Sequence, residues 1–290
     1  MGMKRITAAD ILNQGIALAG ISNDAFSLIV EKNPSTISLY RSGKRAVPLD
    51  VLEKLESLLR LADVDIISLL PVKQEGYLYH STTNLIQGDI DPFFNVGALN
   101  DFGYGFYLGE NLRQAATWGK TGKQTLIYCF PSSALDGCNI YSFSSRPAWY
   151  WLTFIGYNRQ KFSPSDYPRL SSNLARLSND YDVVCGKIAD SFNYAIIENM
   201  FAGRIDVDQA EMASVIIALG NQYCVKSREA ASKLVPEEIL EFDETLSEYF
   251  LRYRSKRESE LESITKNILS RPGTPERMFK AILEKRHGAF

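Results

Sequence analysis

The sequence of 290 residues is long enough for about two domains, and its 45% apolar residues suffice for hydrophobic cores without disulfide staples. Its 32 basic and 34 acidic residues give a formal charge of -2, which excludes a chain that binds nucleic acid over its whole surface, so any such site is local. The start lacks the apolar stretch of a secretory signal, and no apolar run reaches the roughly 20 residues that span a bilayer. We therefore expect a cytoplasmic protein with no membrane contact.

Residues 1–70 are predicted to form an all-α domain of short helices. Apolar residues recur at i, i+3 and i+4 spacing, with Asn23, Asn33 and Pro48 at the joints, over the ranges 8–19, 24–32, 35–41 and 49–61. The stretch AFSLIVEKNPSTISLYRSGKRAVP resembles the helix-turn-helix of Xre-type repressors, in which the helix after the turn lies in the DNA major groove.

A local basic patch accompanies this resemblance, because residues 32–45 contain four basic side chains and no acid. The resemblance implies DNA contacts by the polar and basic residues of this stretch, namely Lys32, Ser35, Thr36, Ser38, Arg41, Lys44 and Arg45. The alternative is a solvated face of a helical bundle used for dimerisation or partner docking, since residues 1–70 carry eight bases and eight acids.

Residues 74–235 are predicted to form an α+β domain. Strand-like runs over 76–80, 125–130, 182–185 and 222–226 alternate with helical runs over 112–118, 191–202 and 208–219. An insertion over 137–172 crowds Tyr, Phe and Trp together without clear alternation. It is either a lid or partner surface or a second small core.

Residues 236–290 are charged and are predicted to be helical to the end, with a last helix over 276–286. We expect a C-terminal helical appendage without chemistry of its own, which packs on the body of the protein or on another copy.

The cysteines and histidines argue against a metal site. The four cysteines are scattered without a CxxC pair, and the two histidines are His80 and His287, so no zinc-type spacing can be assembled. Cys129, Cys185 and Cys224 lie among apolar or β-branched residues, which favours small buried side chains over reactive thiolates.

Three motifs occur in the order LYHST at 78–82, DFGYGFYLGENLRQAATWG at 101–119 and NQYCVKS at 221–227. Together they resemble the ADP-ribosyltransferases of the diphtheria-toxin and poly(ADP-ribose) polymerase type, whose signature is His, Tyr, then Glu. The resemblance covers about residues 76–235 and is closest to an uncharacterised bacterial family of that superfamily. It implies a split β-sheet fold and NAD as substrate, with no metal.

The resemblance also implies roles for single residues. His80 would bind a ribose hydroxyl of the adenosine half, and the backbone of Ser81 would hold the nicotinamide amide. Tyr107 would stack on the nicotinamide ring, with Trp118 on the other side of the pocket, while Gly105 lets the backbone approach the ligand. A single His or Tyr in such a position more often has a structural role. The assignment of an NAD site therefore rests on the occurrence of all three motifs in the expected order.

Gln222 departs from the family signature, because it stands where the catalytic Glu is expected. Glutamine keeps the size and hydrogen bonding but cannot carry the charge that stabilises an oxocarbenium ion. Poly(ADP-ribose) elongation is therefore not expected, and Gln222→Glu is predicted to retain or raise activity. Asp182, Glu211 and above all Asp190 are the acids that could supply charge. We expect His80, Tyr107, Trp118 and Gln222 to line one cleft.

The sequence supports two functions of different classes. The first is a mono-ADP-ribosyltransferase, a toxin or phage-defence effector whose catalytic residues are His80, Tyr107 and Gln222. Its expected partners are NAD, a protein or nucleic-acid acceptor, DNA through the N-terminal domain, and an antitoxin or a second copy of the chain. The second is a DNA-binding transcriptional regulator whose transferase-like domain only binds NAD or a related nucleotide.

Overall fold

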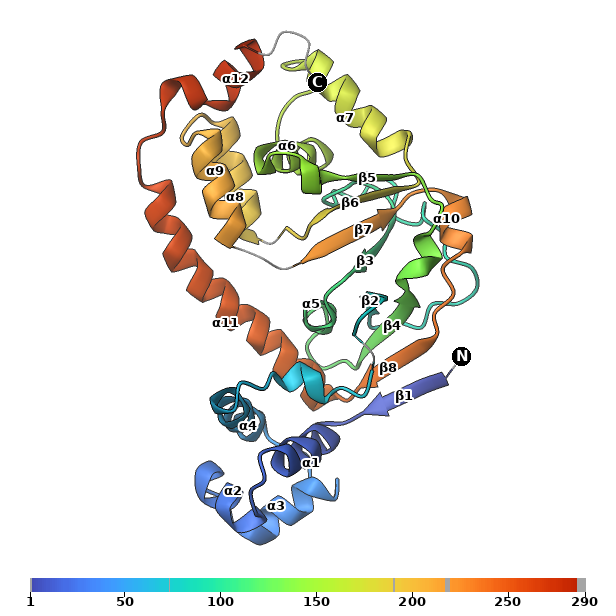
Figure 1. Cartoon of the computed structure of the whole chain (residues 1–290), viewed down its shortest axis with the longest axis vertical. Coiled ribbons are helices and arrows are strands. Elements are labelled where there is room, and N and C mark those ends of the chain that lie inside the picture. The colour runs from blue at the N-terminus through green and yellow to red at the C-terminus, as the bar shows by residue number, and fades with distance from the viewer. Residues whose placement is uncertain (1, 73, 190, 217–219, 286–290) are drawn as a thin grey trace. The chain divides into compact units, whose positions relative to one another are not determined.

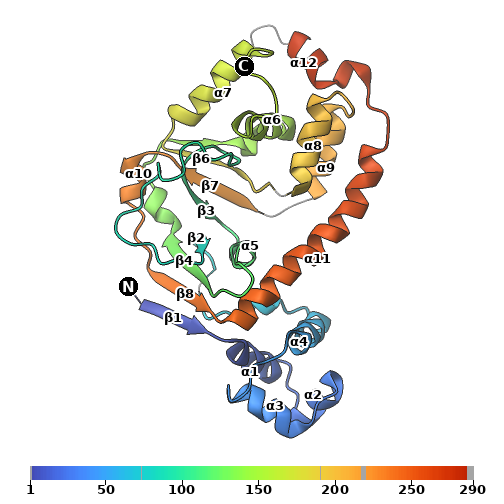
Figure 2. The ribbon, with the colours of Figure 1, turned by 180° about the vertical axis from the view of Figure 1, so that it is seen from behind.

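The computed structural model describes residues 2–72, 74–189, 191–216 and 220–285, and it is a mixed α+β structure, as expected. The chain divides into two compact units, and each is described by itself (Figures 1 and 2). The first unit takes Met1–Ile86, Asn111–Pro131 and Pro236–Ser255, and the second takes Gln87–Glu110, Ser132–Val235 and Lys256–Phe290. Each unit therefore combines parts of more than one of the three segments expected from the sequence.

Among its described residues, the first unit contains four strands in the order β1-β8-β4-β2. β1 (Gly2–Ile6) runs parallel to β8 (Glu238–Phe242), and β4 (Thr125–Pro131) pairs antiparallel with β8 and with β2 (Tyr77–Thr82). Strand β8 corrects the expectation that the chain is helical throughout after residue 236. Its backbone pairs on both sides, with β1 and with β4, and this tertiary pairing outweighs a charged, helix-like composition.

The four predicted N-terminal helices are confirmed, with ends that differ by at most two residues. They are α1 (Ala8–Leu18), α2 (Asn23–Val30), α3 (Pro34–Arg41) and α4 (Leu49–Leu61). Their starts follow local chemistry: Thr7 and Asp10 form a capping box on α1, and the Ser22 side chain caps α2. α3 begins with a proline, which needs no hydrogen-bond donor at that position. Residues 2–6, by contrast, are a strand within the range that was predicted to be all-α.

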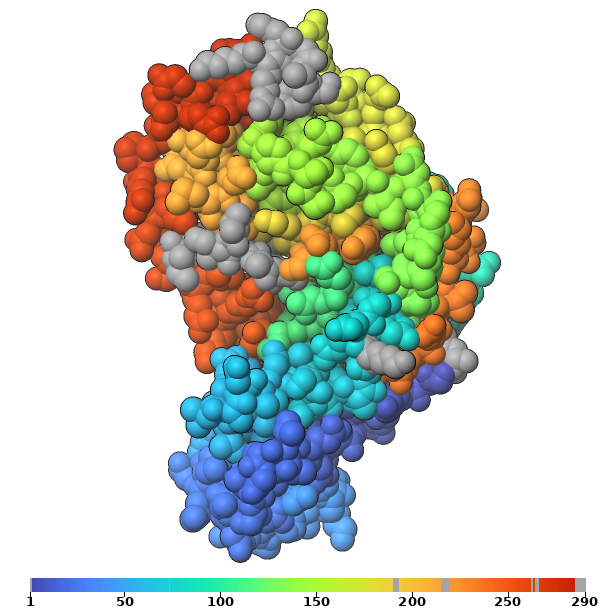
Figure 3. All heavy atoms as spheres, viewed as in Figure 1, coloured from blue at the N-terminus to red at the C-terminus, as the bar shows by residue number. Residues whose placement is uncertain are grey.

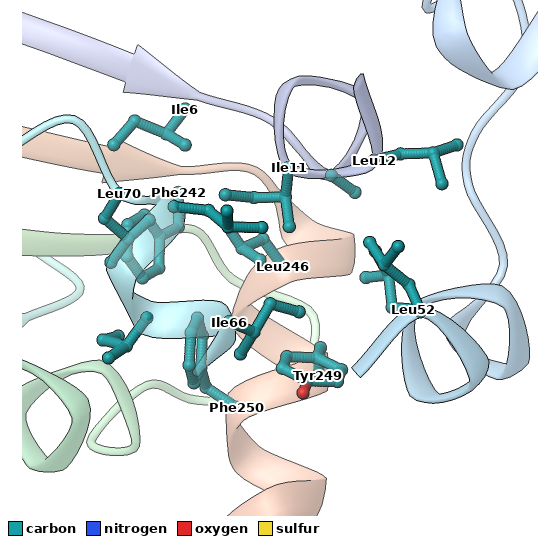
Figure 4. Packing of buried hydrophobic residues seen from close by; sticks show 14 of the residues in the cluster. Ile6, Ile11, Leu12, Leu52, Ile66, Leu70, Phe242, Leu246, Tyr249 and Phe250 are labelled. Carbon is teal, nitrogen blue, oxygen red and sulfur yellow. The ribbon is translucent and has the colours of Figure 1, made fainter. Parts of the chain in front are cut away.

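One hydrophobic core unites these helices with the strands and with the first turns of α11 (Glu244–Leu269) (Figure 4). Side chains from α1, α4, β8 and α11 converge there, including Ile11, Leu12, Leu52, Phe242, Leu246, Tyr249 and Phe250. Arg113 of α5 (Leu112–Ala116) adds two polar contacts at this core. Its guanidinium forms an ion pair with Asp65 and lies 4.5 Å from the centroid of the Tyr253 ring. Helices α1–α4 therefore share their core with segments from the other end of the chain.

In the described part of the second unit there are four strands, in the order β3-β7-β6-β5. β7 (Asn221–Val225) pairs antiparallel with β3 (Phe106–Gly109) and with β6 (Val183–Lys187), and β5 (Ile140–Ser142) runs parallel to β6. Its helices are α6 (Ala148–Asn158), α7 (Pro168–Asn179), α8 (Ser191–Phe201), α9 (Val207–Ile216), α10 (Arg228–Ser232) and α12 (Phe279–Lys285). Helices α6, α8 and α9 pack on one another, as both ribbon views show.

Short 3-10 turns complete the two units at η1 (Ile66–Leu69), η2 (Ser132–Leu135), η3 (Phe143–Ser145) and η4 (Pro275–Arg277).

The aromatic segment 137–172 contributes several large side chains to the core of the second unit. Trp149, Trp151 and Phe154 of α6 are buried, and the ring of Phe102 lies 5.7 Å from that of Phe154 and 6.0 Å from that of Phe143. Of the two alternatives that the sequence left open, the structure supports a core. Among the described helices, none is long and apolar enough to span a bilayer.

Candidate functional site

Tyr107 and Gln222 lie on adjacent strands of the second unit and on the same face of its sheet. In the antiparallel pair of β3 and β7, Tyr107 is opposite Cys224 and Gly109 is opposite Gln222. Side chains alternate between faces along a strand, so Gln222 shares the face of Cys224 and is the diagonal neighbour of Tyr107, at a typical distance of about 7–8 Å. The structure thus brings together the second and third sequence motifs.

The hydroxyl of Tyr107 is committed to the loop before its own strand. It donates to the carbonyl oxygen of Gly103 at 2.7 Å and accepts from the N–H of Phe102 at 2.9 Å. Burial raises the pKa of this phenol well above its usual value, and Cys224 and Asp101 add to the shift. The residue as a whole is half-buried and packs against the core of the second unit. Tyr107 is therefore a neutral phenol whose hydroxyl fixes the loop.

Gly105 allows this loop to lie against β7. Its φ is +144°, and a Cβ at this position would lie 2.3 Å from Cys224 Sγ and 2.8 Å from the Val225 carbonyl oxygen. The side chain of Asn95 accepts from the N–H of Gly105 at 2.9 Å and donates to its carbonyl oxygen at 3.0 Å. The backbone at Gly105 thus lies close to the neighbouring strand, and its expected approach to a ligand stays a prediction.

Lys226, the residue after β7, is buried and binds the backbone of the same loop before β3. Only 2% of its surface is exposed, and its Nζ donates to the carbonyl oxygens of Phe102 at 2.5 Å and of Tyr104 at 2.9 Å. The ammonium also lies 4.4 Å from the centroid of the Tyr104 ring. Burial lowers the pKa of Lys226. Carbonyl dipoles and an aromatic face therefore compensate this buried cation.

Gln222 contacts a buried carboxylate that the sequence analysis did not select. Its Nε2 donates to Asp101 Oδ2 at 3.2 Å and to the carbonyl oxygen of Lys187 at 3.3 Å. On the other carboxylate oxygen, Asp101 Oδ1 accepts from Arg159 Nε at 2.8 Å and from the Tyr194 hydroxyl at 3.0 Å. Asp101 immediately precedes the FGYG motif, which is the one sequence signal that pointed to it, whereas nothing in the sequence pointed to Arg159 or Tyr194.

His80, Ser81 and Trp118 belong to the first unit. His80 lies within β2, opposite Tyr128 of β4. Ser81 Oγ is enclosed and has no hydrogen-bond partner within the described part of the chain. Trp118 follows α5, is 48% exposed, and its ring lies 4.5 Å from the guanidinium carbon of Arg254. The cleft expected to join these residues to Tyr107 and Gln222 stays a prediction.

The acids named as alternative sources of charge have other partners. Asp182 Oδ2 accepts from the N–H of Asn139 at 2.9 Å, and Glu211 Oε1 accepts from the N–H of Ala148 at 3.5 Å. Asp190, the favoured one, lies outside the described residues. In the part of the chain that is described, Asp101 is therefore the carboxylate in contact with Gln222.

The cysteines have the surroundings that the sequence indicated. Cys129, Cys185 and Cys224 are buried, and burial raises their pKa to about 12, about 11 and about 11, so their thiolate forms are suppressed at neutral pH. Within the described ranges, no group of three or more His, Cys, Asp or Glu side chains could hold a metal ion.

Two of the basic residues expected to contact DNA are engaged within the N-terminal helices. Arg41 Nε donates to Asn13 Oδ1 at 2.7 Å, another of its nitrogens donates to Asn23 Oδ1 at 2.5 Å, and Lys32 pairs with Asp50 at 3.7 Å. Other side chains of the predicted interface are exposed, namely Ser35, Ser38, Lys44 and Arg45, and Thr36 is half-buried. Figure 3 shows the surface of these helices in blue.

Comparison with known proteins places the chain in a family. Residues 77–235, more than half of the chain, match the family described as protein of unknown function (DUF3990), and the chain belongs to this family. The matched range contains all three motifs, from His80 to Gln222. No curated protein and no solved structure matches the chain.

Proposed function

We propose that the protein is an NAD-dependent mono-ADP-ribosyltransferase that modifies a protein or a nucleic acid. The observation that carries the proposal is the shared face of Tyr107 and Gln222, an aromatic ring and a hydrogen-bonding amide on adjacent strands beside one loop. This is the pairing that the reaction needs, since the nicotinamide ring and the adjoining ribose of NAD must be held together.

In the proposed reaction, the bond between the ribose anomeric carbon and the nicotinamide nitrogen breaks, and nicotinamide leaves with the electron pair. A nucleophile of the acceptor bonds to the same carbon and loses its proton. Tyr107 stacks on the nicotinamide ring, and Gln222 Oε1 accepts a hydrogen bond from a ribose hydroxyl. Both contacts hold the substrate as positive charge develops on the ribose.

In the first unit, the proposal assigns His80 to a ribose hydroxyl of the adenosine half and the Ser81 backbone to the nicotinamide amide. Trp118 has an accessible ring, in keeping with its proposed place beside the pocket.

The proposed role of the N-terminal helices is to bind DNA through a helix-turn-helix formed by α2 and α3. Because Arg41 and Lys32 have internal partners, we assign the phosphate contacts to the exposed Lys44 and Arg45 and the groove contacts to Ser35, Thr36 and Ser38.

A second candidate function is a DNA-binding regulator that senses NAD without cleaving it. The observation that favours it is the side chain at position 222, which carries no charge of its own at the point where the family signature has Glu. The two functions differ in whether bound NAD loses nicotinamide.

The test is incubation of the purified full chain with NAD labelled in the adenylate moiety, alone and with cell lysate, followed by nuclease or protease digestion. We expect nicotinamide release and label on a macromolecule that one of the two digestions destroys. Tyr107→Ala should reduce both signals about ten- to a hundredfold, whereas Gln87→Ala, a change at an exposed glutamine, should not. An NAD-dependent rise in the melting temperature without nicotinamide release would favour the regulator, and neither effect would overturn both functions.

A further inference from the structure

The carboxamide of Gln222 is oriented by two acceptors. Its Nε2 faces Asp101 Oδ2 at 3.2 Å and the Lys187 carbonyl oxygen at 3.3 Å, and only 8% of the residue is exposed. A carboxylate and a carbonyl can only accept, so the nitrogen of the amide, and not its oxygen, must face them. Gln222 Oε1 accepts no hydrogen bond from the described residues. The oxygen is therefore left to accept a hydrogen bond from a ligand.

Asp101 is itself held in place from three directions. Oδ1 accepts from Arg159 Nε at 2.8 Å and from the Tyr194 hydroxyl at 3.0 Å, and the backbone carbonyl accepts from Asn158 Nδ2 at 3.2 Å. The Arg159 guanidinium also lies 3.9 Å from the centroid of the Tyr194 ring. These contacts leave Oδ2 directed at Gln222, in a setting where the Asp101 side chain is 8% exposed.

A hydrogen bond from an amide to a carboxylate polarises the amide. Charge-assisted hydrogen bonds are roughly twice as strong as neutral ones. In a buried site, linked hydrogen bonds polarise one another, so a strong bond to the amide nitrogen also strengthens a bond that the amide oxygen accepts. Polarisation by Asp101 moves negative charge onto Gln222 Oε1, the atom that occupies the place of a Glu carboxylate oxygen in the family signature.

We propose that Asp101 is a positioning residue that works through Gln222, so that the buried pair Asp101–Gln222 substitutes for a single catalytic glutamate. The inference rests on the proposed function, because it concerns the hydrogen bond to the ribose of NAD. It also predicts that Gln222→Glu does not simply restore the family signature. That change removes the donor and sets a second carboxylate against Asp101, where two like charges oppose each other.

The test exchanges the two groups. Asp101→Asn keeps the shape and removes the charge, Gln222→Glu removes the donor, and the double variant Asp101→Asn/Gln222→Glu restores an amide that donates to a carboxylate. Asp89→Asn, at an exposed aspartate of the same unit, is the matched control. The measurements are nicotinamide release from NAD, the melting temperature, and its rise with added NAD.

We expect each single variant to lose about tenfold or more in nicotinamide release, the size of one lost charge-assisted hydrogen bond. The exchanged pair should exceed both single variants, and Asp89→Asn should equal the wild type. A merely structural Asp101 would lower the melting temperature without this recovery of rate. If Asp101→Asn does not fold, the comparison of Gln222→Glu with the exchanged pair tests the same point.

The results distinguish a failure of this inference from a failure of the proposed function. A wild-type rate in Asp101→Asn, or an exchanged pair no better than Gln222→Glu, would overturn the inference and leave the proposed function intact. A wild type that gains thermal stability with NAD without cleaving it, beside an exchanged pair that cleaves, would overturn the idea that the pair substitutes for glutamate. A wild type that neither binds nor cleaves NAD would overturn the proposed function itself.

Discussion

The hydroxyl of Tyr107 donates a 2.7 Å hydrogen bond to the carbonyl oxygen of Gly103, four positions earlier in the chain. The same hydroxyl accepts from the N–H of Phe102 at 2.9 Å. One side chain thus fastens the loop before β3 through its hydroxyl, and its ring packs against the core of the second unit. The two contributions are separable by substitution.

Tyr107→Phe should destabilise the fold by about 1–3 kcal/mol, because it leaves the part-buried N–H of Phe102 and the part-buried carbonyl of Gly103 without their partner. Chemical denaturation measures the loss. Tyr181→Phe is the control, since the Tyr181 hydroxyl has no hydrogen bond within the described residues. Tyr107→Ala should also weaken NAD binding about ten- to a hundredfold, by loss of ring stacking. Equal stability of Tyr107→Phe and the wild type would contradict the role of the hydroxyl.

Gly105→Ala should be far more damaging than Gly97→Ala. Both glycines have positive φ, +144° and +88°, but an added Cβ meets Cys224 Sγ at 2.3 Å in the first case and nothing within 4 Å in the second. Gly97→Ala should cost about 1–2 kcal/mol of backbone strain. Gly105→Ala adds about 1–3 kcal/mol or more of overpacking against β7. Thermal unfolding compares the two, and similar melting temperatures would refute the close approach at Gly105.

Arg41 and the pair Lys44 and Arg45 should respond in opposite ways. Arg41→Ala removes hydrogen bonds to Asn13 and Asn23, so it should lower stability by about 1–3 kcal/mol. Lys44→Ala with Arg45→Ala should leave stability unchanged and reduce the salt dependence of DNA binding by about two charges. Binding titrations at several salt concentrations measure this slope. Absence of binding to any DNA at low salt would indicate that the helices dock a protein instead.

Asp182 should contribute to stability in a pH-dependent way. A hydrogen bond from the Ser227 side chain, and then one from the N–H of Asn139, lower the pKa of this carboxyl. Because the folded-state pKa lies below the unfolded value of about 3.9, the stabilisation is complete above that value and is lost as the pH falls through the folded-state pKa. Asp182→Asn should therefore reduce stability at neutral pH and flatten its acid decline.

The measurement is the free energy of unfolding of wild type and variant from neutral pH down into the acid range. Asp89→Asn, at an exposed side chain, should reproduce the wild-type curve. Parallel acid declines in wild type and Asp182→Asn would show that this carboxyl is not linked to folding.

Much of the local structure could be read from the sequence, because its causes are local. The periodicity of apolar residues and the caps at Thr7 and Ser22 lie within the helices that they start, and α1 and α2 accordingly lie where the pattern predicts them. Strands β2, β4, β6 and β7 likewise overlap the predicted ranges. Strand β8 was not predicted, because its extended conformation depends on pairing with β1 and β4 and not on its own charged sequence.

The order of the motifs, the residue types of the candidate site and the departure at Gln222 follow from the amino-acid sequence alone. The contacts of those side chains depend on how distant segments fold together. The tertiary structure joined Gln222 to Asp101 across 121 positions, turned Arg41 inward to Asn13 and Asn23, and merged helices α1–α4 into one core with β8 and α11. Such contacts arise from the closure of long loops and the packing of distant surfaces. Neither produces a periodic pattern of residue types from which it could be predicted in a single sequence.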